Sequence, residues 1–96
     1  MSEGGRQQQP PPLEINVQRW NEESFTIEGQ RPELQEQLRP GRRIPDILLL
    51  SNNGDLRHFR NVFITRIEIA FHRATTQTTQ GSMGFVDTTF WFEQLR

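Results

Sequence analysis

Strict alternation of apolar and polar residues near the C-terminus constrains the fold more than any other feature of the sequence. The run from Asn61 to Arg73 is rich in β-branched residues and repeats with a period of two, which predicts a long strand and excludes a helix. The predicted faces are Phe63, Thr65, Ile67, Ile69 and Phe71 on one side, and Arg66, Glu68 and His72 on the other.

A second strand is predicted from Phe85 to Leu95, and both of its faces carry large apolar side chains. One face holds Val86, Phe90 and Phe92, and the other holds Phe85, Trp91 and Leu95. Such a strand needs cover on both faces, from its own core and from a second surface. We therefore predict that Phe85, Trp91 and Leu95 contact another subunit.

A polar stretch, ATTQTTQGSMG, separates these two strands at Ala74–Gly84. A tight hairpin turns within about two to five residues, so the stretch is longer than a turn requires. We predict a long loop that is either slack or reaches toward a partner, and the apolar faces of the flanking strands favour reach. The predicted contact residues are Thr75, Thr76, Gln77, Thr78, Thr79 and Gln80.

A first hairpin is predicted near the N-terminus. Apolar and polar residues alternate from 13 to 17 and again from 25 to 27, and a polar turn at 20–24 lies between them. This pattern predicts two half-buried antiparallel strands.

A second hairpin is predicted in the middle of the chain. Residues 46–50 follow Pro45 as an apolar run that is typical of a strand buried on both faces, and residues 56–60 return as its partner. The Asn53-Gly54 pair between them predicts a tight turn in which both central residues have positive φ.

One short helix is expected between residues 31 and 41, with an ordered loop as the alternative. Pro32 suits the first helical position, Leu34 and Leu38 share a face, and Pro40-Gly41 ends the segment. The whole pattern predicts an all-β, or β-dominated, fold. We expect an antiparallel β-sandwich or partly rolled barrel of about five or six strands, with one short helix, a long loop between the last two strands and an extended N-terminal arm.

Residues 1–12 are predicted to be a flexible or extended arm, and residues 13–96 a single β domain. Glycine, glutamine and proline dominate the arm, and its prolines favour an extended polyproline II segment. It is either a disordered tail or an arm that orders on a neighbouring subunit through Pro10, Pro11 and Pro12. The sequence has no apolar segment typical of a signal peptide or a membrane span.

The chain is poor in core-forming residues. Only 32% of its 96 residues are hydrophobic, and adding seven glycines leaves it below the ~45–50% apolar share of a typical domain. A lean core in a short chain is marginal alone, so we expect assembly, with a small stable monomer as the alternative. The net charge of −1 provides no strong field toward nucleic acid or an anionic membrane.

The sequence offers no catalytic or ligand-binding motif. It has no cysteine, and His58 and His72, predicted on separate strands, lack an evident third metal ligand. It also lacks a Walker lysine, a GxGxxG loop and a nucleophile elbow. We predict no enzyme activity, no catalytic residue, no cofactor and no metal.

The segment Gly54–Leu95 contains a turn, a short strand, a long strand, a loop and a final Thr-rich aromatic strand. This order resembles the closing strands of bacteriophage tail-tube-like proteins. The resemblance implies a small β-sandwich or barrel that donates long strands to a ring, rings that stack into a tube, and loops and arms that bind the next ring. Neck, tail-terminator and capsid-decorating proteins of the same particle are close alternatives.

The expected function is that of a non-enzymatic structural subunit of a bacteriophage particle, in a tail-tube, neck or capsid-associated position. Expected partners are copies of the chain in a ring or lattice and other virion proteins, without a membrane or direct nucleic-acid contact. The expected location is the virion, or the cytoplasm if the protein is not viral. The alternative is a monomeric small β-barrel adaptor that binds single-stranded nucleic acid or a peptide, with Trp20, Phe85 and Trp91 as stacking residues.

Overall fold

A single six-stranded sheet forms most of the protein, in the strand order β1-β4-β5-β6-β3-β2. The computed structural model describes residues 11–78 and 81–95. The elements are β1 (Leu13–Val17), β2 (Arg19–Trp20), β3 (Ser24–Glu28), α1 (Pro32–Gln37), β4 (Arg43–Ser51), β5 (Leu56–Thr78) and β6 (Gly81–Gln94). The predicted β-dominated fold class with one short helix is confirmed.

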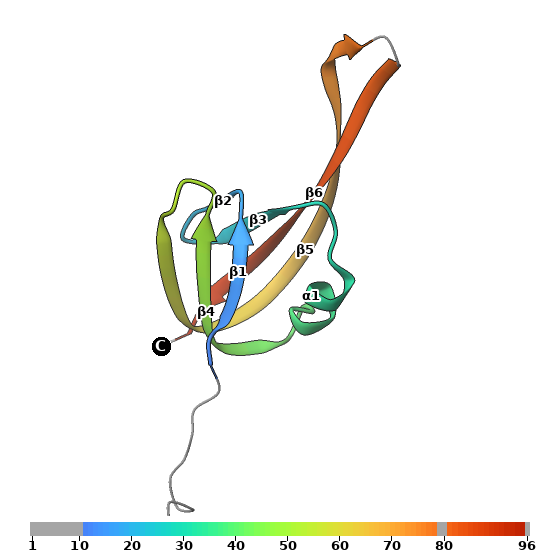
Figure 1. Ribbon diagram of the computed structural model, residues 1–96. Helices are drawn as coiled ribbons and strands as arrows, with labels where there is room; N and C mark the ends of the chain where they lie inside the picture. The colour runs from blue at the N-terminus through green and yellow to red at the C-terminus, as the bar shows by residue number, and fades with distance from the viewer. Residues whose placement is uncertain (1–10, 79–80, 96) are drawn as a thin grey trace, which may run out of the picture.

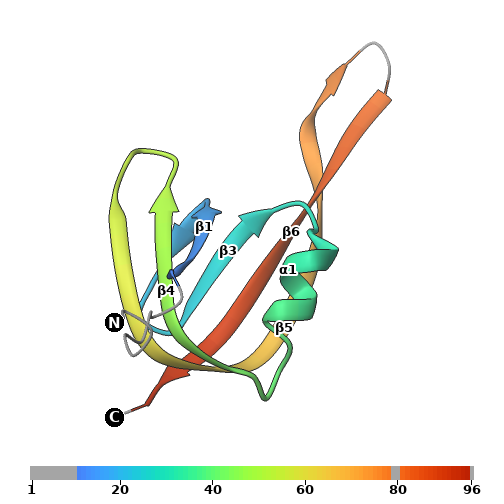
Figure 2. The same ribbon diagram turned by 60° about the horizontal axis from the view of Figure 1, so that its bottom comes forward.

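The sheet curls until its two ends approach each other (Figure 1). β1 and β2 stand at opposite ends of the strand order but are consecutive in sequence, and β1 contacts β3. The molecule is therefore a partly rolled barrel of one sheet rather than a sandwich of two. The helix α1 lies beside β5 and β6 (Figure 2), where it buries Leu34 and its C-cap residue Leu38.

The core fills the inside of the curled sheet and contains four phenylalanines. The Phe25 and Phe90 rings stack with their centroids 5.1 Å apart, and Phe59 meets Phe92 edge-on at 4.9 Å. Offset and edge-to-face contacts are the favoured geometries of aromatic pairs. The buried core residues are Ile15, Val17, Phe25, Ile27, Leu34, Leu38, Ile47, Leu49, Phe59, Val62, Ile64, Phe90 and Phe92.

The predicted first hairpin is wrong in its pairing. β1 pairs with β4 in parallel, from Leu13↔Ile47 to Val17↔Ser51, whereas β3 lies between β2 and β6. The sheet is therefore mixed rather than wholly antiparallel. Alternation specified the inward face of β1 correctly, because Ile15 and Val17 are buried, but alternation does not specify which strand is the neighbour.

The second predicted hairpin exists, but its turn is of another type. Gly54 has a φ of 94°, while Asn53 does not have positive φ. The Gly54 backbone N–H donates to the Ser51 carbonyl at 3.0 Å, and the Ser51 N–H donates to the Asp55 carbonyl at 2.9 Å. Three residues lie between the bonded pair Ser51 and Asp55, with glycine in the left-handed position, as in a type I turn followed by a bulge.

The prediction that residues 46–50 are buried on both faces is also wrong. Ile47 and Leu49 are buried inside the barrel, whereas Leu48 on the outer face is half-buried and Leu50 is 41% exposed. A one-layer barrel covers only the inner face of each strand, so the outer apolar side chains of β4 have no cover within the described residues.

A bulge in β5 changes the face on which its apolar residues lie. The register with β6 shifts between Ile64 and Arg66, so Val62 and Ile64 point inward before the bulge and Ile67 does so after it. The predicted common face of Phe63, Thr65 and Ile67 is wrong, because one extra residue reverses the alternation of all later side chains.

The predicted long loop between the last two strands is wrong, because the strands continue through it. β5 extends to Thr78, and β6 restarts at Gly81. Threonine-rich sequence has high β propensity, and polar side chains are compatible with a ribbon that is solvated on both faces. The extended hairpin contributes to a radius of gyration of 16.9 Å, against about 13 Å for a compact domain of similar length.

Substitution of Phe90 with alanine should reduce the free energy of unfolding by about 3–5 kcal/mol, because it removes a fully buried ring from the centre of the barrel. Phe71 is on the neighbouring strand but is 82% exposed, so Phe71→Ala serves as the matched control and should change stability by at most about 0.5 kcal/mol. Urea denaturation of both variants, at a dilution at which the chain is monomeric, checks this. Equal losses would contradict the assigned core.

Candidate functional site

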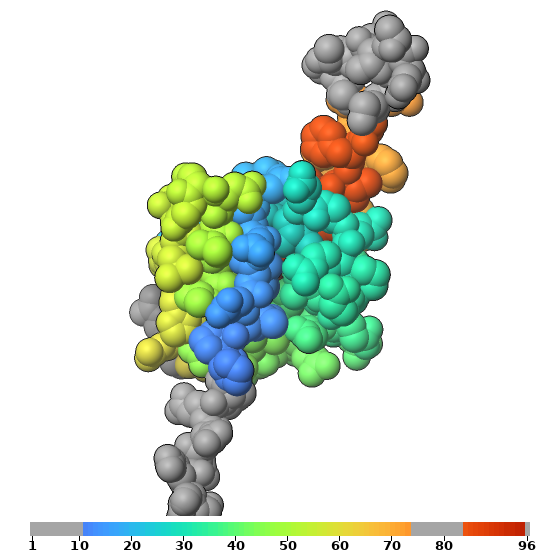
Figure 3. Space-filling model, in the orientation of Figure 1, coloured from blue at the N-terminus to red at the C-terminus, as the bar shows by residue number. Residues whose placement is uncertain are grey.

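The β5–β6 hairpin extends beyond the barrel as a ribbon of only two strands. Pairing of β3 with β6 ends at Glu28↔Asp87, and pairing of β4 with β5 ends at Arg43↔Phe63. We define the projection as residues 71–78 and 81–86, where β5 and β6 pair only with each other among the described residues. Figure 1 shows the two strands rising beyond the barrel, and Figure 3 shows the base of the projection, in orange and red, where it leaves the barrel. An isolated two-stranded ribbon is marginally stable in water, and its outer edges are open to further strand pairing.

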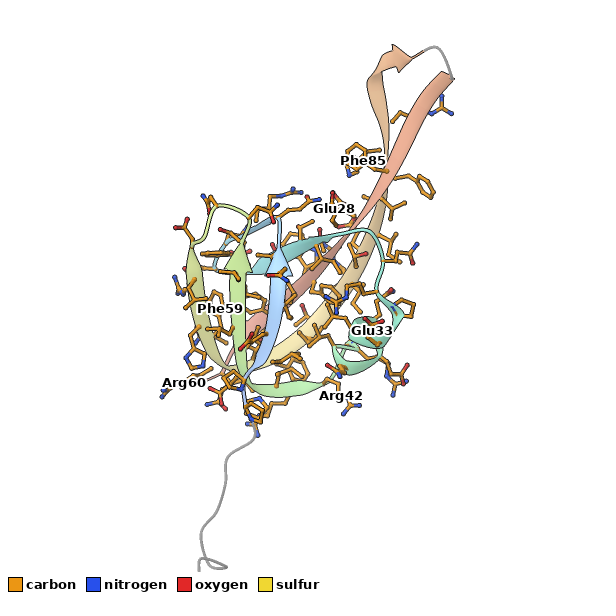
Figure 4. The ribbon with its side chains drawn as sticks, viewed as in Figure 1. Glu28, Glu33, Arg42, Phe59, Arg60 and Phe85 are labelled. Atoms are coloured by element: carbon orange, nitrogen blue, oxygen red, sulfur yellow. The ribbon has the colours of Figure 1, made fainter. Side chains whose placement is uncertain are left out.

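Large apolar side chains gather where the projection leaves the barrel. Phe71 is 82% exposed and Ile69 44% exposed, and they share one face with Val86, which pairs with Phe71. Phe85, on the opposite face, is 50% exposed and stands above the barrel in Figure 4. The projection therefore presents apolar groups on both faces.

A histidine and a buried aspartate meet at the base of the projection. Asp87 is 4% exposed, and its Oδ2 lies 3.1 Å from the Nε2 of His72. The buried Nε2 of His72 has no hydrogen-bond partner among the described residues. The His72 ring stacks on Phe85 with centroids 4.8 Å apart. The His72, Phe85 and Asp87 side chains thus lie together where the ribbon leaves the barrel.

Trp91 and Leu95, the other two predicted contact residues of β6, lie lower on the barrel. Trp91 is half-buried, and the guanidinium of Arg66 lies 4.8 Å from the centre of its ring. Leu95 is half-buried, and its backbone N–H donates to the Asn61 carbonyl at 2.7 Å. The structure thus separates both residues from the exposed Phe85.

The outer face of β4 contains a small hollow with both apolar and polar side chains in its walls. It is bounded by Leu48, Leu50 and Leu56, together with Glu14, Ile15 and Asn16 of β1, and has a volume of about 130 Å³. Leu50 pairs with Leu56, which is 61% exposed. We call this feature the β4 hollow.

A larger and more polar hollow lies at the end of the barrel between two turns. Its volume is about 350 Å³, and its walls are formed by Gln18, Arg19, Trp20, Ser51, Asn52, Asn53 and Asp55. Trp20 is half-buried and supplies an aromatic wall. The combination of an aromatic ring and an arginine is compatible with stacking of a planar group.

The predicted arrangement of the two histidines is wrong, since both lie on β5. His58 is near the barrel end of the strand, where its Nε2 lies 2.8 Å from Asp46 Oδ1, and His72 is in the projection. Within residues 11–78 and 81–95, no group of three or more His, Cys, Asp or Glu side chains could hold a metal ion. No helix in the same residues has the length and hydropathy of a membrane span.

No protein-family model, curated protein or solved structure matches the chain.

The remaining predicted contact residues lie in two places. The backbone of Thr75, Thr76, Gln77 and Thr78 forms the distal part of β5. Pro11 and Pro12 are exposed at the start of the described chain. Pro10, Thr79 and Gln80 lie outside the described residues.

Sequence reasoning missed Leu50, Leu56 and Phe71 as surface residues. All three were assigned to strands, but the fold leaves them exposed to solvent. The available signal was the lean composition, since a one-layer barrel of this length cannot cover both faces of every strand.

The pKa of one carboxyl group is clearly perturbed. The pKa of Glu33, in the first turn of α1, is lowered by a hydrogen bond from its own backbone N–H and by the Arg31 side chain. Glu33 is fully exposed, so this shift concerns the start of the helix rather than the surfaces described above.

Replacement of Trp91 with alanine should leave a folded monomer and reduce assembly, because the indole lies on the outer face of β6. Size-exclusion chromatography with light scattering measures assembly, and circular dichroism measures folding. Phe90→Ala, one residue away on the inner face, is the matched control and should destabilise the fold itself. Global unfolding of the Trp91 variant would instead assign the indole to the core.

Proposed function

We propose that this chain is a non-enzymatic structural subunit that self-assembles, in a tail-tube, neck or capsid-associated position of a bacteriophage particle. The main support for this proposal is the projection. A two-stranded ribbon with exposed apolar groups is only marginally stable in water, and contact with another surface would stabilise it.

Two further observations support assembly over a monomeric role. The exposed large apolar residues are distributed between two regions, the base of the projection and the β4–β5 hairpin. Among the described residues, the projection also pairs with no third strand, so its edges can add a strand from a neighbour. The assignment to a phage particle comes from the resemblance of residues 54–95 alone.

A second candidate function is a monomeric adaptor that binds single-stranded nucleic acid or a peptide. The hollow beside Trp20 and Arg19 favours it, since an aromatic wall and a guanidinium can bind a base by stacking. Against it stand the net charge of −1 and the Arg57–Glu22 ion pair, at 3.0 Å, that neutralises a nearby arginine.

Deletion of Thr75–Gln80 should preserve folding and impair assembly. In the shortened chain the paired residues Arg73 and Gly84 would be joined by a loop of about four residues, a length that hairpins tolerate. Light scattering should show oligomers for the full chain and a smaller species for the variant, with matching circular dichroism spectra. Unchanged assembly would remove the projection tip from the interface.

Electron microscopy of the concentrated protein should show rings, tubes or a lattice.

Fluorescence anisotropy with a labelled single-stranded oligonucleotide tests the adaptor function at two salt concentrations. A monomer at all concentrations, with oligonucleotide binding that weakens steeply as salt increases, would replace the structural proposal with the adaptor.

A further inference from the structure

Two features with apolar side chains lie on different parts of the molecule. One is Phe71, an almost fully exposed ring at the base of the projection. The other is the β4 hollow, a concave site with three leucines in its walls. We propose that Phe71 of one copy of the chain docks in the β4 hollow of a second copy, an inference that rests on the proposed self-assembly and identifies its contact.

The size of the hollow is suited to one aromatic ring. An apolar cavity of about 150 Å³ in another protein binds benzene, and the β4 hollow measures about 130 Å³. A phenyl ring placed in the hollow would lie against Leu50 and Leu56 in its walls. Ile69, two residues before Phe71 on the same face, extends the apolar contact along the ribbon.

The charges around the two features are also complementary. Arg73 follows Phe71 on the same face of β5 and is exposed. Glu14 forms part of the wall of the hollow and is exposed as well. Neither forms an ion pair within the described residues, so docking brings an arginine toward a carboxylate at the edge of the contact.

The contact must form between copies. Phe71 belongs to the projection, while the hollow lies on the β1–β4 side of the barrel, and the 82% exposure of Phe71 excludes docking within one molecule. Each copy then offers one ring and one hollow at different places. Such a heterologous contact generates a closed ring or an open filament, depending on the angle between neighbours.

Two single substitutions test the contact. Phe71→Asp removes the ring and leaves the hollow, and Leu50→Asp blocks the hollow and leaves the ring. Each variant alone should be a folded monomer, with the dissociation constant of the contact increased at least about thirtyfold, as for a central interface residue. Thr65→Asp and Asn52→Asp add the same charge at exposed positions on β5 and in the β4–β5 turn, and should assemble like the unmodified chain.

Mixing the two variants gives the decisive measurement. The intact ring of Leu50→Asp should dock in the intact hollow of Phe71→Asp, and no further site remains for growth. Light scattering and native mass spectrometry should therefore detect a heterodimer of twice the 11.3 kDa chain mass, in a 1:1 ratio, only in the mixture. If Leu50→Asp fails to fold, Leu56→Asp blocks the same hollow at a residue that is 61% exposed.

Three results would overturn the contact. Assembly of a hollow variant like the unmodified chain would exclude the hollow while leaving self-assembly intact. A mixture that stays monomeric would exclude docking of the ring in the hollow. A monomeric unmodified chain at all concentrations would remove both this contact and the proposed structural function.

Discussion

The pairing of β5 with β6 is the interaction on which the rest of the structure depends. The same ladder begins at Val62↔Gln94 as a wall of the barrel and ends at Thr78↔Gly81 at the tip of the projection. Its inner face supplies Phe90 and Phe92 to the core, and its outer edges bind β4 and β3. A shift of this register would therefore displace the core and the exposed apolar groups together.

Local pattern predicted much of the fold but not the neighbours of its strands. The inward residues of β1, the helix at Pro32 and the hairpin at Gly54 all follow from short-range signals. The parallel pairing of β1 with β4 does not follow from such signals, because the alternation of apolar and polar residues within a strand does not depend on which strand is its neighbour. The bulge at Thr65 could not be predicted from the sequence pattern either, because a one-residue insertion in the ladder depends on packing around β6.

The candidate site shows the same division. The apolar outer face of β6 was readable from Phe85 and Trp91, and Phe85 is indeed exposed. The exposure of Phe71 could not be predicted, because the sequence of a strand does not show whether further strands pair beside it and cover its side chains. The polar composition of the stretch after Arg73 predicts a loop, but threonine-rich sequence is also compatible with an extended two-stranded ribbon. Composition was the one global signal, and a one-layer barrel leaves apolar outer faces uncovered.

The strand pairing also determines from which end of the barrel the chain ends and the projection leave. β1 begins at Leu13 beside Ile47, and the last paired residue of β6, Gln94, lies opposite Val62, which in turn pairs with Ile44. The two ends of the described chain therefore leave from one end of the barrel, and the projection leaves from the other (Figure 1). A fluorophore or affinity tag on either end is kept away from the projection. If subunits align in an assembly, such labels would mark one side of it and reveal its direction.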